Sequence, residues 1–223
     1  MEKHTYKIDP WKIIEEGWDP GKVMGSESIF SIGNGAMGQR ANFEEDFSGK
    51  SLQGSYIGGI YYPDKTKVGW WKNGYPEYFA KVINAPSWIG ISISIDSIPL
   101  DLNKVDKIEK FERKLDMKNG LYERSISVKI KNDLKVEINS KRFISMKRKS
   151  VGAISYKIRC NRDVKISMSP YINFDVSNDD SNWDEKFWET KDKINTKNKS
   201  LVKSKVKKTG FKVITYMKAD LYD

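Results

Sequence analysis

Three clusters of adjacent carboxylates are the residues of this chain best placed for acid–base chemistry. They are Glu44–Glu45–Asp46, Asp179–Asp180 and Asp184–Glu185. Glycoside cleavage uses two carboxyl groups at a defined distance in space, and adjacency in sequence does not supply that distance. We therefore interpret the clusters as exposed charge, with Arg40 as a surface ion-pair partner of Glu44 and Glu45.

Histidine and cysteine chemistry is restricted by number, because His4 and Cys160 are the only residues of their types. One histidine and one cysteine do not make a histidine-based triad or a zinc site. Cys160 lies in an apolar alternating segment, which favours a core position over a nucleophile. We predict no catalytic residue and no metal ligand in this chain.

A glycine-rich motif, Gly33-Asn34-Gly35-Ala36-Met37-Gly38, follows the apolar stretch 29–32. The spacing satisfies the dinucleotide fingerprint, but that fingerprint also needs a helix after the glycines and a second parallel strand ending in an acid. The segment 39–49 is too short and too acidic for that helix. We interpret the motif as a tight Asn-Gly hairpin rather than a nucleotide site.

Eight aromatic residues lie between Tyr56 and Phe79, interleaved with glycine, proline, asparagine and charges. Turn formers between the rings indicate a shaped loop surface, and flat rings beside amides and carboxylates suit the apolar face and hydroxyl rim of a sugar. A satellite core beneath a long loop and a surface facing another domain are the alternatives. The candidate carbohydrate- or domain-contact residues are Trp70, Trp71, Asn73, Tyr75, Glu77 and Tyr78.

The elements that position these residues have the period of β-strands. Apolar residues alternate with polar ones over 91–95 and 126–138, with turns predicted at Asp96-Ser97 and Asn132-Asp133. Further strands are predicted at 98–100, 142–146, 153–159, 164–168 and 211–217. With no helical run of 12 or more residues between them, the strands predict an antiparallel sandwich or barrel. The segment 178–208 breaks the rhythm and is predicted to be a long excursion between strands.

Length and composition narrow the function further. The 223 residues can bury one sizeable core, and the net charge of +10 comes mostly from lysine dispersed on the polar half of the alternation. Nucleic-acid readers rely more on arginine and aromatic platforms, so we do not expect nucleic acid as a partner. Nothing is apolar enough to span a membrane or to act as a signal peptide, so the expected location is cytoplasmic.

The chain resembles the N-terminal domain of glycoside hydrolase family 65. The resemblance is carried by 11–20, 27–45, 54–56, 61–66 and 69–81, and more loosely by 115–117, 142–143 and 182–188. It covers nearly the whole chain, and within the family it points to the maltose phosphorylases and related disaccharide phosphorylases. One departure is Ala41, where glycine is common in the family.

The resemblance implies an all-β antiparallel super-sandwich of the galactose-mutarotase-like kind over 1–223, truncated at its C-terminal end. In the family this domain precedes an (α/α)6 barrel that carries the catalytic glutamate and the phosphate-binding residues, and that barrel is absent here. The implied role is a non-catalytic domain that supports the barrel and dimerisation, with a disaccharide as substrate, inorganic phosphate as co-substrate and no cofactor. A free-standing carbohydrate-binding module and a hydrolase parent such as a trehalase are the alternatives.

Overall fold

The computed structural model describes residues 5–66, 74–179 and 185–222. These residues form mainly antiparallel strands with one short helix. They divide into two compact units, one made of Met1–Leu52 and Ile91–Ser169, the other of Gln53–Gly90 and Pro170–Asp223. The antiparallel all-β prediction is confirmed.

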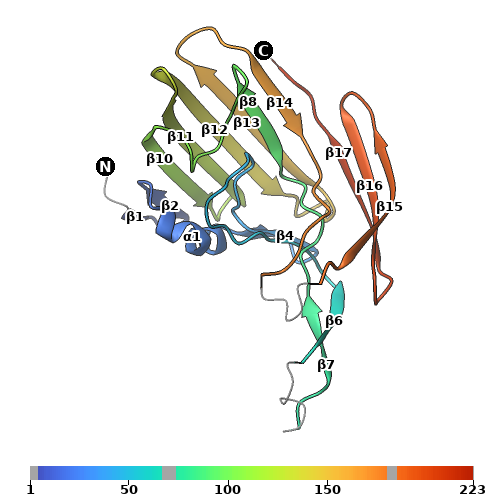
Figure 1. Ribbon diagram of the computed structural model, residues 1–223. Helices are drawn as coiled ribbons and strands as arrows, with labels where there is room; N and C mark the ends of the chain where they lie inside the picture. The colour runs from blue at the N-terminus through green and yellow to red at the C-terminus, as the bar shows by residue number, and fades with distance from the viewer. Residues whose placement is uncertain (1–4, 67–73, 180–184, 223) are drawn as a thin grey trace. The chain divides into compact units, whose positions relative to one another are not determined.

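A six-stranded antiparallel sheet forms the frame of the first unit (Figure 1). Its strand order is β1-β2-β10-β11-β12-β13. The strands are β1 Thr5–Ile8, β2 Lys12–Glu16, β10 Lys107–Asp116, β11 Leu121–Ile130, β12 Leu134–Ile144 and β13 Gly152–Cys160. The predicted strands 134–138 and 142–146 are one strand, β12, because the polar residues between them keep the same alternation.

Shorter elements complete this unit. They are the 3-10 helix η1 Pro20–Lys22, the helix α1 Val23–Ile29, and the strands β3 Ile32–Gly33, β4 Met37–Gln39, β8 Ile91–Ile95, β9 Ile98–Pro99 and β14 Ile166–Pro170. Asp19 caps η1, since its Oδ1 accepts the Gly21 N–H at 2.9 Å, with Pro20 as the first helical residue. No helix in the described ranges is long and apolar enough to cross a membrane.

The core of the first unit lies on one face of this sheet. Alternating residues of β11 and β12 point into it, and the three isoleucines of β8 pack against them. Its buried members include Ile91, Ile93, Ile95, Phe111, Ile126, Val128, Ile130, Leu134, Val136 and Ile138. Cys160 packs at the edge of this cluster, and burial raises the pKa of its thiol, in agreement with a core role.

Both predicted tight turns are confirmed by their backbone angles. Asp96 and Ser97 have φ of 47° and 66°, and Asn132 and Asp133 have φ of 61° and 54°. Two successive positive φ values match the right-handed twist of a hairpin, and Asp and Asn tolerate them better than most residues. The side chain of Asp96 also accepts the backbone N–H of Lys165 at 2.8 Å, which ties this turn to the start of β14.

The second unit contains the strand β5 Ser55–Ile57, the hairpin β6 Tyr61–Lys65 with β7 Tyr78–Val82, and the three-stranded sheet β15 Trp188–Asn195, β16 Lys199–Val206 and β17 Lys212–Lys218. A separate apolar cluster holds it together, built on Tyr62, Ile83, Phe187, Trp188 and Val206. The Trp188 indole N–H donates to the Asn84 carbonyl at 2.6 Å within this core.

The prediction of an excursion over 178–208 is wrong for its second half, because β15 and β16 pair over almost their full length. The alternation there is real but weak: Ser204 lies between the buried Val202 and Val206, and on the exposed face lysines alternate with few apolar residues. A three-stranded sheet with one solvated face needs few apolar residues, so its strands lack a strong period-two signal.

Candidate functional site

Three arginines project from the buried face of the six-stranded sheet. Arg113 of β10 lies opposite Arg124 of β11, and Arg142 of β12 lies opposite Tyr122. All three arginines are at most 2% exposed. A guanidinium removed from water is costly unless it is paired, so this face must also hold anions.

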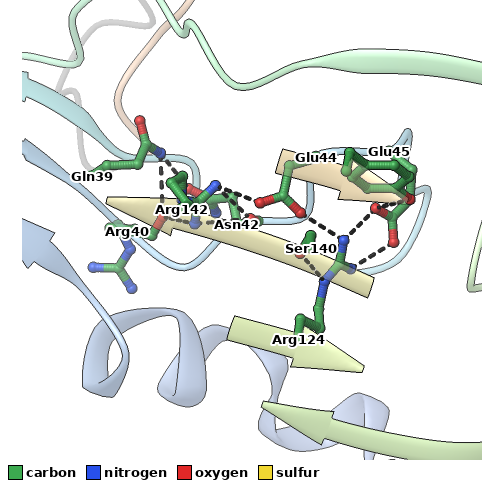
Figure 2. A network of polar contacts seen from close by, with 9 residues as sticks. Gln39, Arg40, Asn42, Glu44, Glu45, Arg124, Ser140 and Arg142 are labelled. Atoms are coloured by element: carbon green, nitrogen blue, oxygen red, sulfur yellow. Dashed lines mark hydrogen bonds and ion pairs between the residues drawn. The ribbon is translucent and has the colours of Figure 1, made fainter. Parts of the chain in front are cut away.

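Glu44 and Glu45 supply those anions from the segment that follows β4. Arg124 lies between them, with Nη2 donating to Glu44 Oε2 at 2.6 Å and Nη1 donating to Glu45 Oε1 at 2.5 Å (Figure 2). Arg142 Nη1 lies 3.1 Å from the other oxygen of Glu44. The Tyr156 hydroxyl donates to Glu45 Oε2 at 3.0 Å.

The sequence interpretation of these carboxylates is therefore wrong for Glu44 and Glu45, which are buried, and holds for Asp46, which is exposed. Arg40 is not the partner of either glutamate. Its guanidinium donates instead to the Met24 carbonyl and to Ser28 Oγ on α1. The glutamates have buried arginines as partners because the 40–46 segment crosses the arginine-bearing face of the sheet.

Glu15 completes the charge balance on the same face. Its Oε2 lies 2.6 Å from Arg113 Nε, and its Oε1 accepts the Ser26 hydroxyl of α1 at 2.6 Å. Three arginines thus meet three glutamates, and the network is neutral. Burial opposes the charged form of Arg124, but Glu45 and Glu44 outweigh it and hold its pKa well above the ordinary value. A neutral, buried network is suited to fixing a fold rather than to acid–base chemistry.

Tyr156 gives this network a predicted alkaline sensitivity. Burial, and then the charge of Glu45, raise the pKa of Tyr156 well above its usual 10.0. Above about pH 10 the unfolded chain releases this proton before the folded chain does, so the contribution of Tyr156 to stability declines as pH rises. We expect the stability advantage of the native protein over Tyr156→Phe to be about 1–3 kcal/mol at pH 8 and to shrink above pH 10. Urea unfolding of both proteins at several pH values measures it, and a constant difference would contradict the assignment.

The glycine-rich motif forms the predicted hairpin, with Ile32 opposite Gln39 and Gly33 opposite Gly38. Gly35 occupies its turn with φ of 83°. Ala41, just after the hairpin, is buried, donates its N–H to the Glu27 carbonyl at 2.9 Å and lies outside the left-handed region, so a methyl group is tolerated there. The prediction of a hairpin is confirmed.

Asn34 is the residue of this motif that makes tertiary contacts. Its amide nitrogen donates to the carbonyls of Ser145 at 2.7 Å and Lys149 at 2.9 Å, beyond the end of β12. Its amide oxygen accepts the N–H groups of Ala36 at 3.0 Å and Met37 at 2.9 Å. One side chain thus fixes the hairpin turn and attaches it to the 145–151 turn.

Asn34→Ala is accordingly expected to lower the free energy of unfolding by about 2–3 kcal/mol, because four hydrogen bonds lose their partner. Asn119→Ala is the matched control, since Asn119 sits in an exposed turn and its side-chain amide donates to Asp116 at 2.9 Å. Urea unfolding should separate the two variants. Equal losses would show that the contacts of Asn34 to the 145–151 turn contribute nothing.

The predicted contact residues fall on or near the β6–β7 hairpin. Tyr78 pairs with Lys65 and is 47% exposed, Tyr75 is 62% exposed, and Glu77 is exposed with its carbonyl accepting the Thr66 N–H at 2.8 Å. On the opposite face of the hairpin, Asp64 and Lys81 form a buried ion pair at 3.3 Å. Trp70, Trp71 and Asn73 lie outside the described residues, so the candidate surface is seen only in part.

Sequence reasoning missed the buried arginines, although their positions in the period-two alternation of their strands predict that they point inward. Arg124 has the same parity as Ile126 and Val128, and Arg142 the same as Val136 and Ile138, so both fall on the inward face of their strands. Their glutamate partners have no such signal. Within the described residues, no three His, Cys, Asp or Glu side chains are grouped to hold a metal ion.

Comparison with known proteins places the chain in a family. Residues 13–223 match the model of the glycosyl hydrolase family 65 N-terminal domain. Maltose phosphorylase of Bacillus subtilis (strain 168) is 46% identical over 190 residues, which are 85% of this chain and 25% of that protein. Alpha,alpha-trehalose phosphorylase of Thermoanaerobacter brockii is 32% identical over 79% of this chain and 23% of its own length.

A solved structure agrees with these matches. A putative kojibiose phosphorylase from human microbiome superposes with a TM-score of 0.86 at 29% identity, covering 100% of this chain and 29% of its own. The chain thus spans about a quarter of the length of these curated relatives. With the family model matched over almost the whole sequence, the chain belongs to the N-terminal domain family of glycosyl hydrolase family 65.

Proposed function

We propose that this chain acts as the non-catalytic N-terminal domain of an inverting disaccharide phosphorylase. The observation that carries the proposal is the 46% identity to a maltose phosphorylase over 85% of the chain. The reaction would convert maltose, or a related α-glucose disaccharide, and inorganic phosphate into glucose 1-phosphate and glucose. Inorganic phosphate is the co-substrate, no other cofactor is involved, and the enzyme works in the cytoplasm as a homodimer.

The buried carboxylates favour a scaffolding role for this chain over a catalytic one. The carboxylates Glu15, Glu44 and Glu45 are buried and paired with arginine, so they are not available to protonate a glycosidic oxygen. A domain held together by a neutral ionic network presents a rigid body against which a catalytic (α/α)6 barrel can be placed. The exposed Tyr75, Glu77 and Tyr78 would then face that barrel or its substrate mouth.

Two assays test the proposal. The isolated chain, incubated with maltose and phosphate, should form no glucose 1-phosphate. A chimera in which this chain replaces the matched N-terminal quarter of the B. subtilis maltose phosphorylase should catalyse phosphorolysis, whereas the same enzyme without that quarter should not. Turnover by the isolated chain would contradict the non-catalytic role, and an inactive chimera would contradict the role as a phosphorylase domain.

A free-standing carbohydrate-binding module is the second candidate, favoured by the exposed rings of Tyr75 and Tyr78. Aromatic faces on an exposed hairpin are suited to stacking on a pyranose. Saturable quenching of tryptophan fluorescence by maltose, glucose or trehalose, reduced in Tyr78→Ala, would favour this module. If these sugars cause no change in fluorescence, the result would favour the non-catalytic phosphorylase domain over the binding module. A family 65 hydrolase parent such as a trehalase would be recognised by its lack of phosphate dependence.

A further inference from the structure

The outer face of the β15–β16–β17 sheet carries an apolar row across all three strands. Ile194, Leu201 and Tyr216 lie opposite one another in register, and Ile214 follows in the next row opposite Lys203. Ile194 is 51% exposed, Tyr216 56% and Ile214 62%. The sheet thus has a second apolar surface that is not part of the core of its unit.

Lysine pairs flank this row on both sides, further along the strands. Lys199 lies opposite Lys218, and Lys205 lies opposite Lys212, on the same face as the apolar residues. Like charges directly opposite each other on neighbouring strands destabilise a sheet. Lys205 has Glu189 opposite it on β15 and Lys218 binds Asp220, so within the described residues Lys199 and Lys212 are the members of these pairs left to attract an anion from elsewhere.

The acidic residues near this face are already used. Asp192 binds Lys203 at 3.0 Å, Asp220 binds Lys218 at 2.7 Å, and Glu189 binds Lys191. Glu189 also lies opposite Lys205 on β15 without forming an ion pair to it, and in the part of the chain that the structure describes Lys212 forms no ion pair either. The face therefore keeps an excess of positive charge around its apolar centre.

We propose that this face, made of Ile194, Leu201, Ile214, Tyr216, Lys205 and Lys212, is the docking surface for an acidic surface on the catalytic region of a family 65 phosphorylase. The inference rests on the proposed function. An apolar centre with a charged rim is the anatomy of a protein interface. The matched relatives are about four times as long as the matched segment, so each supplies such a region in its own polypeptide. A second copy of this chain is disfavoured because it would bring the lysine rims together.

The test uses the chimera described above, with a protease site at the junction, so that the dissociation constant of the two cut parts can be measured. Tyr216→Ser and Lys212→Glu should each weaken association about tenfold, because one removes the aromatic ring of the apolar row and the other reverses a rim charge. Lys157→Glu is the matched control, since Lys157 is exposed on β13, and it should change association less than about twofold. Added salt should weaken the unmodified complex more than the Lys212→Glu complex.

A second measurement, on the isolated chain alone, separates an effect on docking from an effect on folding. Lys212→Glu places an acid opposite Lys205, so it should raise the melting temperature of the free chain by about 1–4 °C while weakening the complex. A lowered melting temperature would overturn the charge argument. An active chimera whose parts associate equally well with and without the variants would overturn the docking face and leave the proposed function standing.

Three further outcomes would overturn the proposed docking face or assign it to another partner. A chimera that is inactive with the unmodified chain overturns the proposed function, and the docking face with it. Light scattering that shows a dimer of the isolated chain, lost in Tyr216→Ser, would assign the face to a second copy instead. Binding of the chain to phosphatidylserine vesicles, lost in Lys212→Glu, would assign it to an anionic membrane surface.

Discussion

Replacing Arg124 by methionine is expected to lower the free energy of unfolding by about 3–5 kcal/mol, because the change leaves two buried glutamates without their shared cation. Arg124 contacts both Glu44 and Glu45, and its guanidinium also lies 4.8 Å from the ring centroid of Phe43. Methionine fills much of the volume, so the loss reports charge more than packing. Urea unfolding, with hydrogen exchange of β10 to β12, measures the effect.

The matched control for Arg124→Met is Lys141→Met on the outer face of the neighbouring strand β12. Lys141 binds Glu123 at 2.7 Å but is 60% exposed, so its loss should cost less than about 1 kcal/mol. Adding Glu45→Leu to Arg124→Met should restore part of the stability, because it removes one of the two buried carboxylates that Arg124→Met leaves without their cation. If Arg124→Met is no worse than Lys141→Met, the network does not hold the 40–46 segment to the sheet.

The sheet of the first unit could be predicted from sequence because its signals are local. The isoleucines of β8 and the alternation of β11 and β12 set which face is buried, and Asp96-Ser97 and Asn132-Asp133 supply the turn chemistry. β10 was not predicted, because charged residues fill its segment between Phe111 and Leu115. One of them, Arg113, occupies an inward position, which a hydrophobic pattern does not reveal.

The sequence could predict the inward position of the arginines of the buried network, but not that of their glutamate partners. The parity of Arg124 and Arg142 within their strands places them on the core face, which is a signal that the printed sequence contains. The position of Glu44 and Glu45 depends on where an irregular segment crosses a sheet 79 or more residues away in sequence, and no local period encodes that. Adjacent acids therefore looked like solvated charge, and only tertiary structure shows them buried.

The candidate contact surface stays a prediction, since sequence and structure inform different parts of it. Composition singles out the aromatic segment, and the β6–β7 register then shows that Tyr61, Pro63, Tyr78, Ala80 and Val82 share the face opposite the buried Asp64–Lys81 pair. Tyr61 of this face packs edge-on against Phe211, whereas Tyr78 and Val82 stay exposed, and an isolated two-stranded hairpin is only marginally stable in water. The surface therefore suits contact with a ligand or a second domain, which is the distinction that the sugar titrations make.

Phe187→Ala is expected to lower the free energy of unfolding of the second unit by about 3–5 kcal/mol. Phe187 is fully buried, and its ring centroid lies 4.8 Å from that of Tyr62, another member of the same cluster. Truncation opens a cavity at the centre of a small core. Trp188 is held by its hydrogen bond to Asn84 and Tyr62 is fixed in β6, so neither side chain can move to fill the cavity.

Because each unit has its own apolar cluster, the effect of Phe187→Ala should be local. Hydrogen exchange should speed up in β15 to β17 and in β5 to β7, while β10 to β12 keep their protection. Phe143→Ala, at a 42% exposed position on the first unit, is the control of the same residue type and should cost about 1 kcal/mol or less. Equal loss of protection in both units would mean that the two cores unfold as one cooperative body, and the buried arginine network would then stabilise the second unit as well as the first.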